Sequence, residues 1–163
     1  MEAAMQLLFD NDLNKIIKNY DSNSFRNKYV CKEVDEIYTG YMPVLSAIYK
    51  RFSGRNNRPG TKPFMSPNEF TDLCMWAELV NDTFNVRDID VCYNLSMMTR
   101  MDEVTRDQHL QMSQVEFYEA IARVADIAKH PEPWLEDGPR PEIDENETPL
   151  WKRIENLMPK IIM

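Results

Sequence analysis

The sequence is poor in several residue types on which common functional classes depend. It holds two histidines, four glycines and three cysteines in 163 residues. With so few histidines, no nucleophile motif and no glycine-rich phosphate loop, the pattern argues against an enzyme. Cys31, Cys74 and Cys92 are well separated and form no C-x-x-C pair. This spacing argues against a disulfide framework or a zinc site, and it favours reduced thiols in a reducing compartment.

Positive charge is also scarce. Lys and Arg total 19 against 27 Asp and Glu, which gives a formal net charge of −8. Nucleic-acid binders gain much of their affinity from clustered cations, so we expect no nucleic-acid partner. No uncharged stretch approaches the ~20 residues that span a bilayer, and the first residues lack the pattern of a signal peptide. We therefore expect a soluble, cytoplasmic or cytoskeletal protein with no membrane partner.

The most informative feature is a repeat of the pattern Met-Ser-x-x-Glu-Phe, at residues 65–70 and 112–117. In each copy the serine is an N-cap candidate, and the glutamate three residues later can accept a hydrogen bond from the backbone N–H of that serine. The methionine before the cap and the phenylalanine after the glutamate have the spacing of a hydrophobic staple. The repeat thus predicts two helix starts built alike. Their structural caps are Ser66, Glu69, Phe70, Ser113, Glu116 and Phe117.

Apolar residues at helical spacing predict an all-α fold. The expected core helices cover residues 34–52, 66–80, 86–98 and 113–128. An N-terminal extension, residues 1–33, adds a helix over 3–20 and a polar, turn-like stretch over 21–27. Gly40 and Pro43 lie inside the first core helix and leave open a kink or a start near Pro43. The aromatic side chains that we expect in the core include Trp76, Tyr38, Tyr41 and Tyr49.

The composition changes after residue 129. Residues 130–149 hold five of the ten prolines and seven acidic residues against one base, Arg140. We therefore expect an acidic, proline-rich linker over 130–148 in an extended conformation. Residues 149–163 then have the pattern of a short amphipathic helix. A stripe as apolar as the one on this helix needs a groove, either on this chain or on a partner.

The two helix–loop–helix units over residues 34–129 resemble a paired EF-hand module. In that family the end of the calcium loop has the same pattern as these boxes, and its glutamate is both a bidentate calcium ligand and the third residue of the exiting helix. The residues before the boxes depart from the family. A twelve-residue loop ending at Glu69 would place at its first ligand positions Arg58, Gly60 and Lys62, and basic residues repel calcium.

In the second loop the same count gives Thr105, Asp107 and His109. Neither this set nor a longer loop beginning at Asp102 provides the six to eight oxygens that calcium takes. We therefore expect Glu69 and Glu116 to hold helices and not calcium, and we expect no cofactor. The alternative is a calcium sensor that binds the ion in the second loop. Its ligands would include Asp102, Asp107 and Glu116.

A narrower resemblance, over about residues 37–128, is to degenerate EF-hand modules of ciliary and flagellar proteins in protists. It is carried by motifs such as Asn81-Asp82-x-Phe84, Arg87-Asp88-Ile89 and Glu119-Ala120-Ile121-Ala122-Arg123. It implies a structural or regulatory role in a cilium, flagellum or other cytoskeletal assembly.

We therefore expect a non-catalytic interaction or scaffold module that binds a helical or extended segment of a protein partner. A calcium sensor is the first alternative and an enzyme is the second. Three methionines suit either a groove that repacks around partner helices or gap-filling in the core. Together with the last helix, they give the candidate partner-binding residues, which are Met97, Met98, Met101, Trp151, Ile154 and Leu157.

Overall fold

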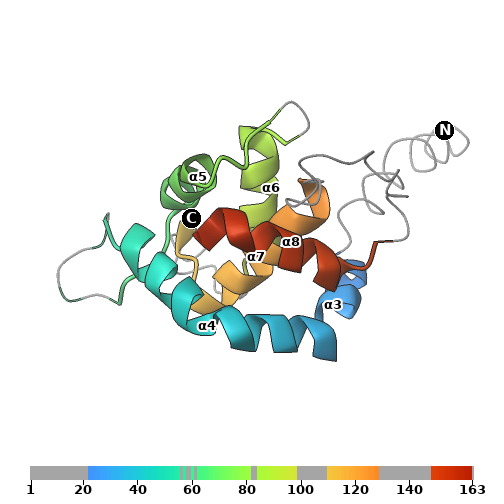
Figure 1. Cartoon of the computed structure of the whole chain (residues 1–163). Helices are drawn as coiled ribbons and strands as arrows, with labels where there is room; N and C mark the ends of the chain where they lie inside the picture. The colour runs from blue at the N-terminus through green and yellow to red at the C-terminus, as the bar shows by residue number, and fades with distance from the viewer. Residues whose placement is uncertain are drawn as a thin grey trace, which may run out of the picture.

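The computed structural model describes residues 22–55, 57, 60, 62–81, 84–98, 110–128 and 148–162. Within these residues the regular structure is helical apart from one isolated β-bridge, which confirms the predicted all-α class. The helices are α3 (Ser22–Tyr29), α4 (Lys32–Phe52), α5 (Pro67–Trp76), α6 (Val86–Ser96), α7 (Gln114–Ile127) and α8 (Leu150–Ile162). Figure 1 shows their arrangement. The helix expected over 3–20 lies outside the described residues, as do residues 130–147 of the expected linker.

Helix α3 corrects the expectation of a turn-like stretch over residues 21–27. The sequence of α3 is mostly polar, but Phe25 and Tyr29 are four residues apart, their rings stack at 6.0 Å between centroids, and Phe25 is buried. The guanidinium of Arg123, on α7, lies 4.1 Å from the centre of the Phe25 ring. The helix is therefore held by tertiary contacts that local composition does not reveal.

Helix α4 begins at Lys32, two residues before the expected start, and it continues through Pro43 without a break. Pro43 and Gly40 both lie on its exposed side, and nothing lies within 4 Å of the position that a Cβ on Gly40 would take. A proline removes one intrahelical hydrogen bond, and an exposed carbonyl can bind water instead. The opposite face buries Val34, Tyr38, Leu45, Ile48, Tyr49 and Phe52.

Helix α5 ends at Trp76, four residues earlier than expected, because the chain turns sharply after Ala77. The backbone N–H of Glu78 donates to the carbonyl of Met75, and that of Leu79 donates to the carbonyl of Cys74, each at 3.0 Å. This pair of hydrogen bonds is a Schellman motif, and Glu78 has the left-handed φ of 52° that the motif requires.

The turn after α5 also corrects the expectation that Trp76 lies in the core. The turn brings Leu79 into the core instead, with no exposed surface. Trp76 stays 39% exposed and Val80 stays 38% exposed. The Trp76 ring is covered in part by Arg51, whose guanidinium lies 5.4 Å from the ring centre.

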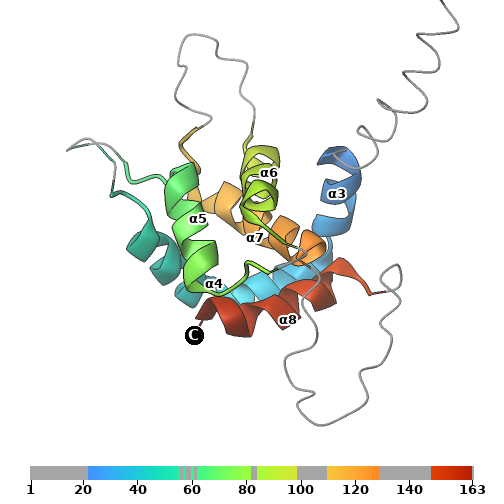
Figure 2. The same ribbon diagram turned by 90° about the horizontal axis from the view of Figure 1, so that it is seen from above.

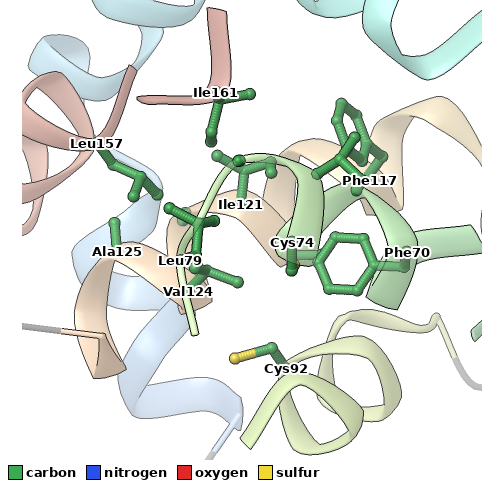
Figure 3. Packing of buried hydrophobic residues seen from close by; sticks show 14 of the residues in the cluster. Phe70, Cys74, Leu79, Cys92, Phe117, Ile121, Val124, Ala125, Leu157 and Ile161 are labelled. Carbon is green, nitrogen blue, oxygen red and sulfur yellow. The ribbon is translucent and has the colours of Figure 1, made fainter. Parts of the chain in front are cut away.

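The helices pack around one buried apolar cluster. Helix α6 packs against α5 and α7, and α8 lies against both α4 and α7. Figures 1 and 2 show that α8 runs beside α4 in the same direction and antiparallel to α7. Figure 3 shows Leu157 and Ile161 of α8 pointing toward α7. In the part of the chain that the structure describes, no helix combines the length and apolarity needed to cross a membrane.

Candidate functional site

The two copies of the repeat meet at the isolated β-bridge, which joins Met65 to Met112 in antiparallel orientation. Each residue donates its backbone N–H to the carbonyl of the other, and both N–O distances are 3.0 Å. Both methionine side chains are fully buried. The bridge therefore pairs equivalent residues of the repeat and brings the two helix starts side by side.

Two tyrosines cross between the repeats and reinforce this bridge. The Tyr49 hydroxyl donates to the carbonyl of Met112 at 2.8 Å, and the Tyr93 hydroxyl donates to the carbonyl of Met65 at 2.9 Å. Burial, with Glu116 nearby, raises the pKa of Tyr49 to about 12, and burial also raises the pKa of Tyr93 well above its usual range. Both hydroxyls therefore stay protonated near neutral pH and remain donors.

The staple phenylalanines extend the crossed arrangement. Phe117 lies 5.5 Å from Tyr49, and Phe70 lies 6.0 Å from Tyr93, between ring centroids. The two phenylalanine rings meet each other edge to face at 6.5 Å. Such pairs contribute about 0.5–1.5 kcal/mol beyond burial. Each unit thus supplies a ring to the other, and the four rings form one cluster.

Ser66 and Ser113 begin α5 and α7 with complete capping boxes, in which the serine side chain accepts from the backbone N–H of Glu69 or Glu116. Glu69 Oε2 accepts from the Ser66 backbone N–H at 2.7 Å, and Glu116 Oε2 accepts from that of Ser113 at 2.7 Å. Both glutamates are buried, with 2% and 8% of their surfaces exposed.

The other oxygen of each carboxylate reaches back to the preceding helix. Glu69 Oε1 accepts from the backbone N–H of Arg55 at 2.6 Å, just after α4 ends. Glu116 Oε1 accepts from the backbone N–H of Met98 at 2.8 Å, just after α6 ends. Each glutamate therefore ties the end of one helix to the start of the next, across the whole loop between them.

In this arrangement all four carboxylate oxygens of Glu69 and Glu116 accept hydrogen bonds from backbone N–H groups. The positive ends of these N–H groups repel a cation, whereas calcium takes six to eight oxygen ligands. Among the described residues, no group of three or more His, Cys, Asp or Glu lies close enough to hold a metal ion. Asp102, Asp107 and His109 lie outside the described residues.

Two of the three candidate partner-binding methionines lie among the described residues. Met97 is buried in the core with 8% of its surface exposed, whereas Met98 is 55% exposed. The role of Met98 in the described structure is its backbone N–H, which binds Glu116. Met101 lies outside the described residues.

The last helix packs on this chain itself, against a surface formed by α4 and α7 that we call the groove. The face of α8 toward α4 and α7 is buried, with Ile154 fully covered and Leu157 1% exposed. Trp151 lies beside this face and is half-buried. The buried residues of α8 are Leu150, Ile154, Leu157, Met158 and Ile161. The predicted partner-binding residues Ile154 and Leu157 thus contact the chain's own core.

Arg153 fixes the start of α8 against the end of α7. Its Nη1 donates to the Asp126 carboxylate at 2.9 Å and to the Asp126 carbonyl at 3.1 Å, and its Nε donates to the carbonyl of Thr148 at 3.2 Å. The carbonyl of Asp126 is one of the last four of α7, which have no partner inside the helix. A cation at this position also meets the negative end of the helix dipole.

A buried charge cluster that the sequence analysis missed joins α3 to α7. The Glu119 carboxylate accepts from Arg123 at 2.7 Å and from Arg26 at 3.2 Å. Glu119 and Arg123 are 5% and 4% exposed, so each charge depends on its partner. Their spacing of four residues on one helix is a signal that sequence inspection can find. The contribution of Arg26, 93 residues away, has no such signal.

The buried cysteines are poor nucleophiles in this fold. Burial raises the pKa of the Cys92 thiol to about 12 and raises that of Cys74 further above its usual range. Both thiols therefore stay protonated at neutral pH. All three cysteines are free.

Comparison with known proteins gives no match: no protein-family model, no curated protein and no solved structure matches this chain.

Proposed function

We propose that this chain is a non-catalytic interaction module, in which a paired EF-hand-like core binds an amphipathic helix without calcium. The pairing of two equivalent units is supported by the Met65–Met112 bridge and by the crossed bonds of Tyr49 and Tyr93. The independence from metal is supported by Glu69 and Glu116, whose carboxylates accept backbone hydrogen bonds where an EF-hand glutamate would bind the ion.

The observation that carries the interaction function is the seating of α8. An amphipathic helix that lays its apolar face into a groove is a recurring mode of peptide recognition, with anchors at helical spacing. Helix α8 has this form, since its buried residues recur at spacings of three and four along the helix. The groove formed by α4 and α7 therefore offers the apolar surface that such a helix needs.

The chain between α7 and α8 also supports a helix that can be exchanged. Arg153 contacts Asp126 directly, so the two helix ends lie close together. Antiparallel helices in that position need only about 2–8 connecting residues. Residues 129–147 connect them here, and this segment is rich in proline and acid. A connection longer than the span lowers the effective concentration of α8 in its groove, and this favours competition by a partner.

The test separates an exchangeable ligand from a fixed part of the core. A protease site is inserted after Gly138 in the full chain, which is then cleaved. A fluorescent peptide with the sequence of residues 148–163 is added, and exchange is followed by anisotropy. We expect saturable binding to the cleaved chain and much weaker binding to the intact chain. The matched control peptide carries Leu157→Asp and should not bind.

Two results would overturn the proposed interaction function. In the first, the cleaved fragment stays bound and does not exchange with the peptide. In the second, the chain unfolds and aggregates once the fragment leaves. Either result would make α8 an ordinary core helix. Far-UV circular dichroism of the cleaved chain, with and without excess peptide, distinguishes the second result from simple release.

The resemblance to ciliary modules supports a further part of the proposal, which is a role in a cilium, flagellum or other cytoskeletal assembly. Fluorescence microscopy of a tagged chain tests this location directly. The calcium-sensor alternative predicts saturable heat of calcium binding that Glu116→Gln abolishes. We expect isothermal titration to give no such heat for either the natural chain or this variant.

A further inference from the structure

We propose that the groove selects one kind of partner, a basic amphipathic helix with an arginine that binds Asp126 and the carboxyl end of α7. This inference rests on the proposed function, because it specifies the partner of the same groove. Helix α8 serves as the template of that partner. Three features of its seat define the chemistry: an arginine contact, an order of apolar anchors and a difference in charge.

The arginine contact sets direction as well as affinity. Arg153 Nη1 contacts both the carboxylate and the carbonyl of Asp126, at 2.9 and 3.1 Å. The two side chains are 24% and 30% exposed, so solvent screens the pair only in part. This site lies at the end of α7, and Arg153 lies in the first turn of α8, so a helix that places its arginine as α8 does begins there and runs antiparallel to α7 (Figures 1 and 2).

The apolar anchors set the register relative to this arginine. Leu150 precedes Arg153 by three residues, and the other buried residues of α8 follow it by one, four, five and eight: Ile154, Leu157, Met158 and Ile161. In Figure 3, Leu157 and Ile161 point toward Ala125 and Ile121 of α7. A partner helix therefore needs apolar residues at these five positions, counted from its arginine.

The charge of the template complements the rest of the molecule. Helix α8 carries three basic residues, Lys152, Arg153 and Lys160, against one acid, Glu155. The whole chain nevertheless has a net charge of −8, so the residues outside α8 are acidic, and residues 130–149, with seven acids against one base, contribute most of that charge. A basic helix is attracted to such an acidic chain, and an acidic helix with the same apolar stripe is repelled.

The same charges argue against a second copy of this chain as the usual occupant. Reciprocal exchange of α8 between two copies would bring two acidic bodies together, each with the strongly acidic residues 130–149. Like charges at that range raise the free energy of association. The partner that we infer is therefore a helix on a different protein.

The experiment uses the cleaved full chain and labelled peptides that span residues 148–163. Against the natural peptide, we expect Arg153→Gln to weaken binding by about tenfold, as loss of a charge-assisted hydrogen bond does. The affinity of the Arg153→Lys peptide should lie between those of the natural and Arg153→Gln peptides, because lysine keeps the charge but lacks the planar guanidinium with its several donors. On a chain with Asp126→Asn, the difference between the natural and Arg153→Gln peptides should shrink to about twofold or threefold.

A designed peptide tests the partner code itself. It keeps the arginine and the five apolar residues and replaces every other position by alanine, glutamine or lysine. We expect it to bind within about tenfold of the natural peptide. A peptide of the same composition, with the five apolar residues spread around the helix, is the control, and we expect no binding because it has no continuous apolar stripe.

Each outcome bears on one proposal. If no peptide binds, the proposed helix-binding function fails. If the natural and Arg153→Gln peptides bind equally, the groove stands but the arginine selection is refuted. If light scattering after size-exclusion chromatography shows the intact chain to be a dimer that cleavage and excess peptide dissociate, the occupant is a second copy and our inference is wrong.

Discussion

Replacing Glu69 by glutamine tests whether its carboxylate holds the backbone or is left from a metal site. Glu69 accepts from the backbone N–H groups of Ser66 and Arg55 at 2.7 and 2.6 Å, and from the Ser66 hydroxyl at 2.9 Å. Glutamine keeps the shape but replaces one oxygen with an NH₂ group that faces a donor. Hydrogen bonds to a charged acceptor contribute about 1.5–3 kcal/mol each.

We therefore expect Glu69→Gln to lower the free energy of unfolding by about 2–4 kcal/mol, which is a large part of the total for a domain of this size. The opposite sign is expected for a ligand of an empty metal site. There, neighbouring carboxylates repel one another, and removing one charge stabilises the metal-free protein. The sign of the change thus separates the two roles of the residue.

The measurement is urea unfolding followed by far-UV circular dichroism, first in a chelator and then in excess calcium. Glu116→Gln, in the second box, should lose a similar amount, since its carboxylate accepts in the same way from Ser113 and Met98. Glu155→Gln, at an exposed position on α8, is the matched control and should change little. Unchanged or raised stability of Glu69→Gln in the chelator would refute the bracing role.

Three further predictions follow from the described residues. Glu78→Gly should raise the free energy of unfolding by about 0.5–1 kcal/mol, because glycine adopts the left-handed φ of 52° without strain; an unchanged or lower urea midpoint would contradict this. Burial raises the pKa of Tyr49 above the unfolded value of 10, to about 12. The contribution of the Tyr49 hydroxyl to the free energy of unfolding should therefore be complete below about pH 10 and fall between about pH 10 and 12. The urea midpoint of Tyr49→Phe should then decrease less than that of the natural chain as the pH rises through this range. Cys74 and Cys92 should react with a thiol reagent only after urea unfolds the chain, which absorbance of the released chromophore measures.

Local signals in the sequence account for the parts of the fold that were predicted correctly. The two Ser-x-x-Glu boxes mark helix starts because the cap, its glutamate and its staple lie within six residues of one another. Both boxes are present in the structure, at Ser66 and Ser113. The apolar spacing of α7 and α8 is likewise contained within each helix.

The errors arise where distant contacts or an unusual conformation decide the structure. Helix α3 has only two apolar anchors, and its stability depends on Arg123 and Glu119, more than 90 residues away. The early end of α5 depends on Glu78, a residue type that seldom adopts a positive φ and so gives no warning of a turn.

The most important part of the candidate site leaves no trace in composition. Oε1 of Glu69 and Oε1 of Glu116 accept hydrogen bonds from the backbone N–H groups of Arg55 and Met98. Every residue except proline carries such a group. Sequence inspection predicts that the glutamates cap their helices. It does not predict that they also reach back across each loop.

The crossed bonds of Tyr49 and Tyr93 have a consequence for how the chain is divided. Each hydroxyl completes the hydrogen bonding of a carbonyl in the other half, so a fragment containing only one half has a buried tyrosine and a bridge residue without their partners. The pairing of equivalent residues across the bridge offers one remedy, because a second copy of the same fragment carries an equivalent tyrosine and methionine. Isolated halves should therefore associate in pairs, and we expect the pair, rather than the single helix–loop–helix, to be the smallest folding unit.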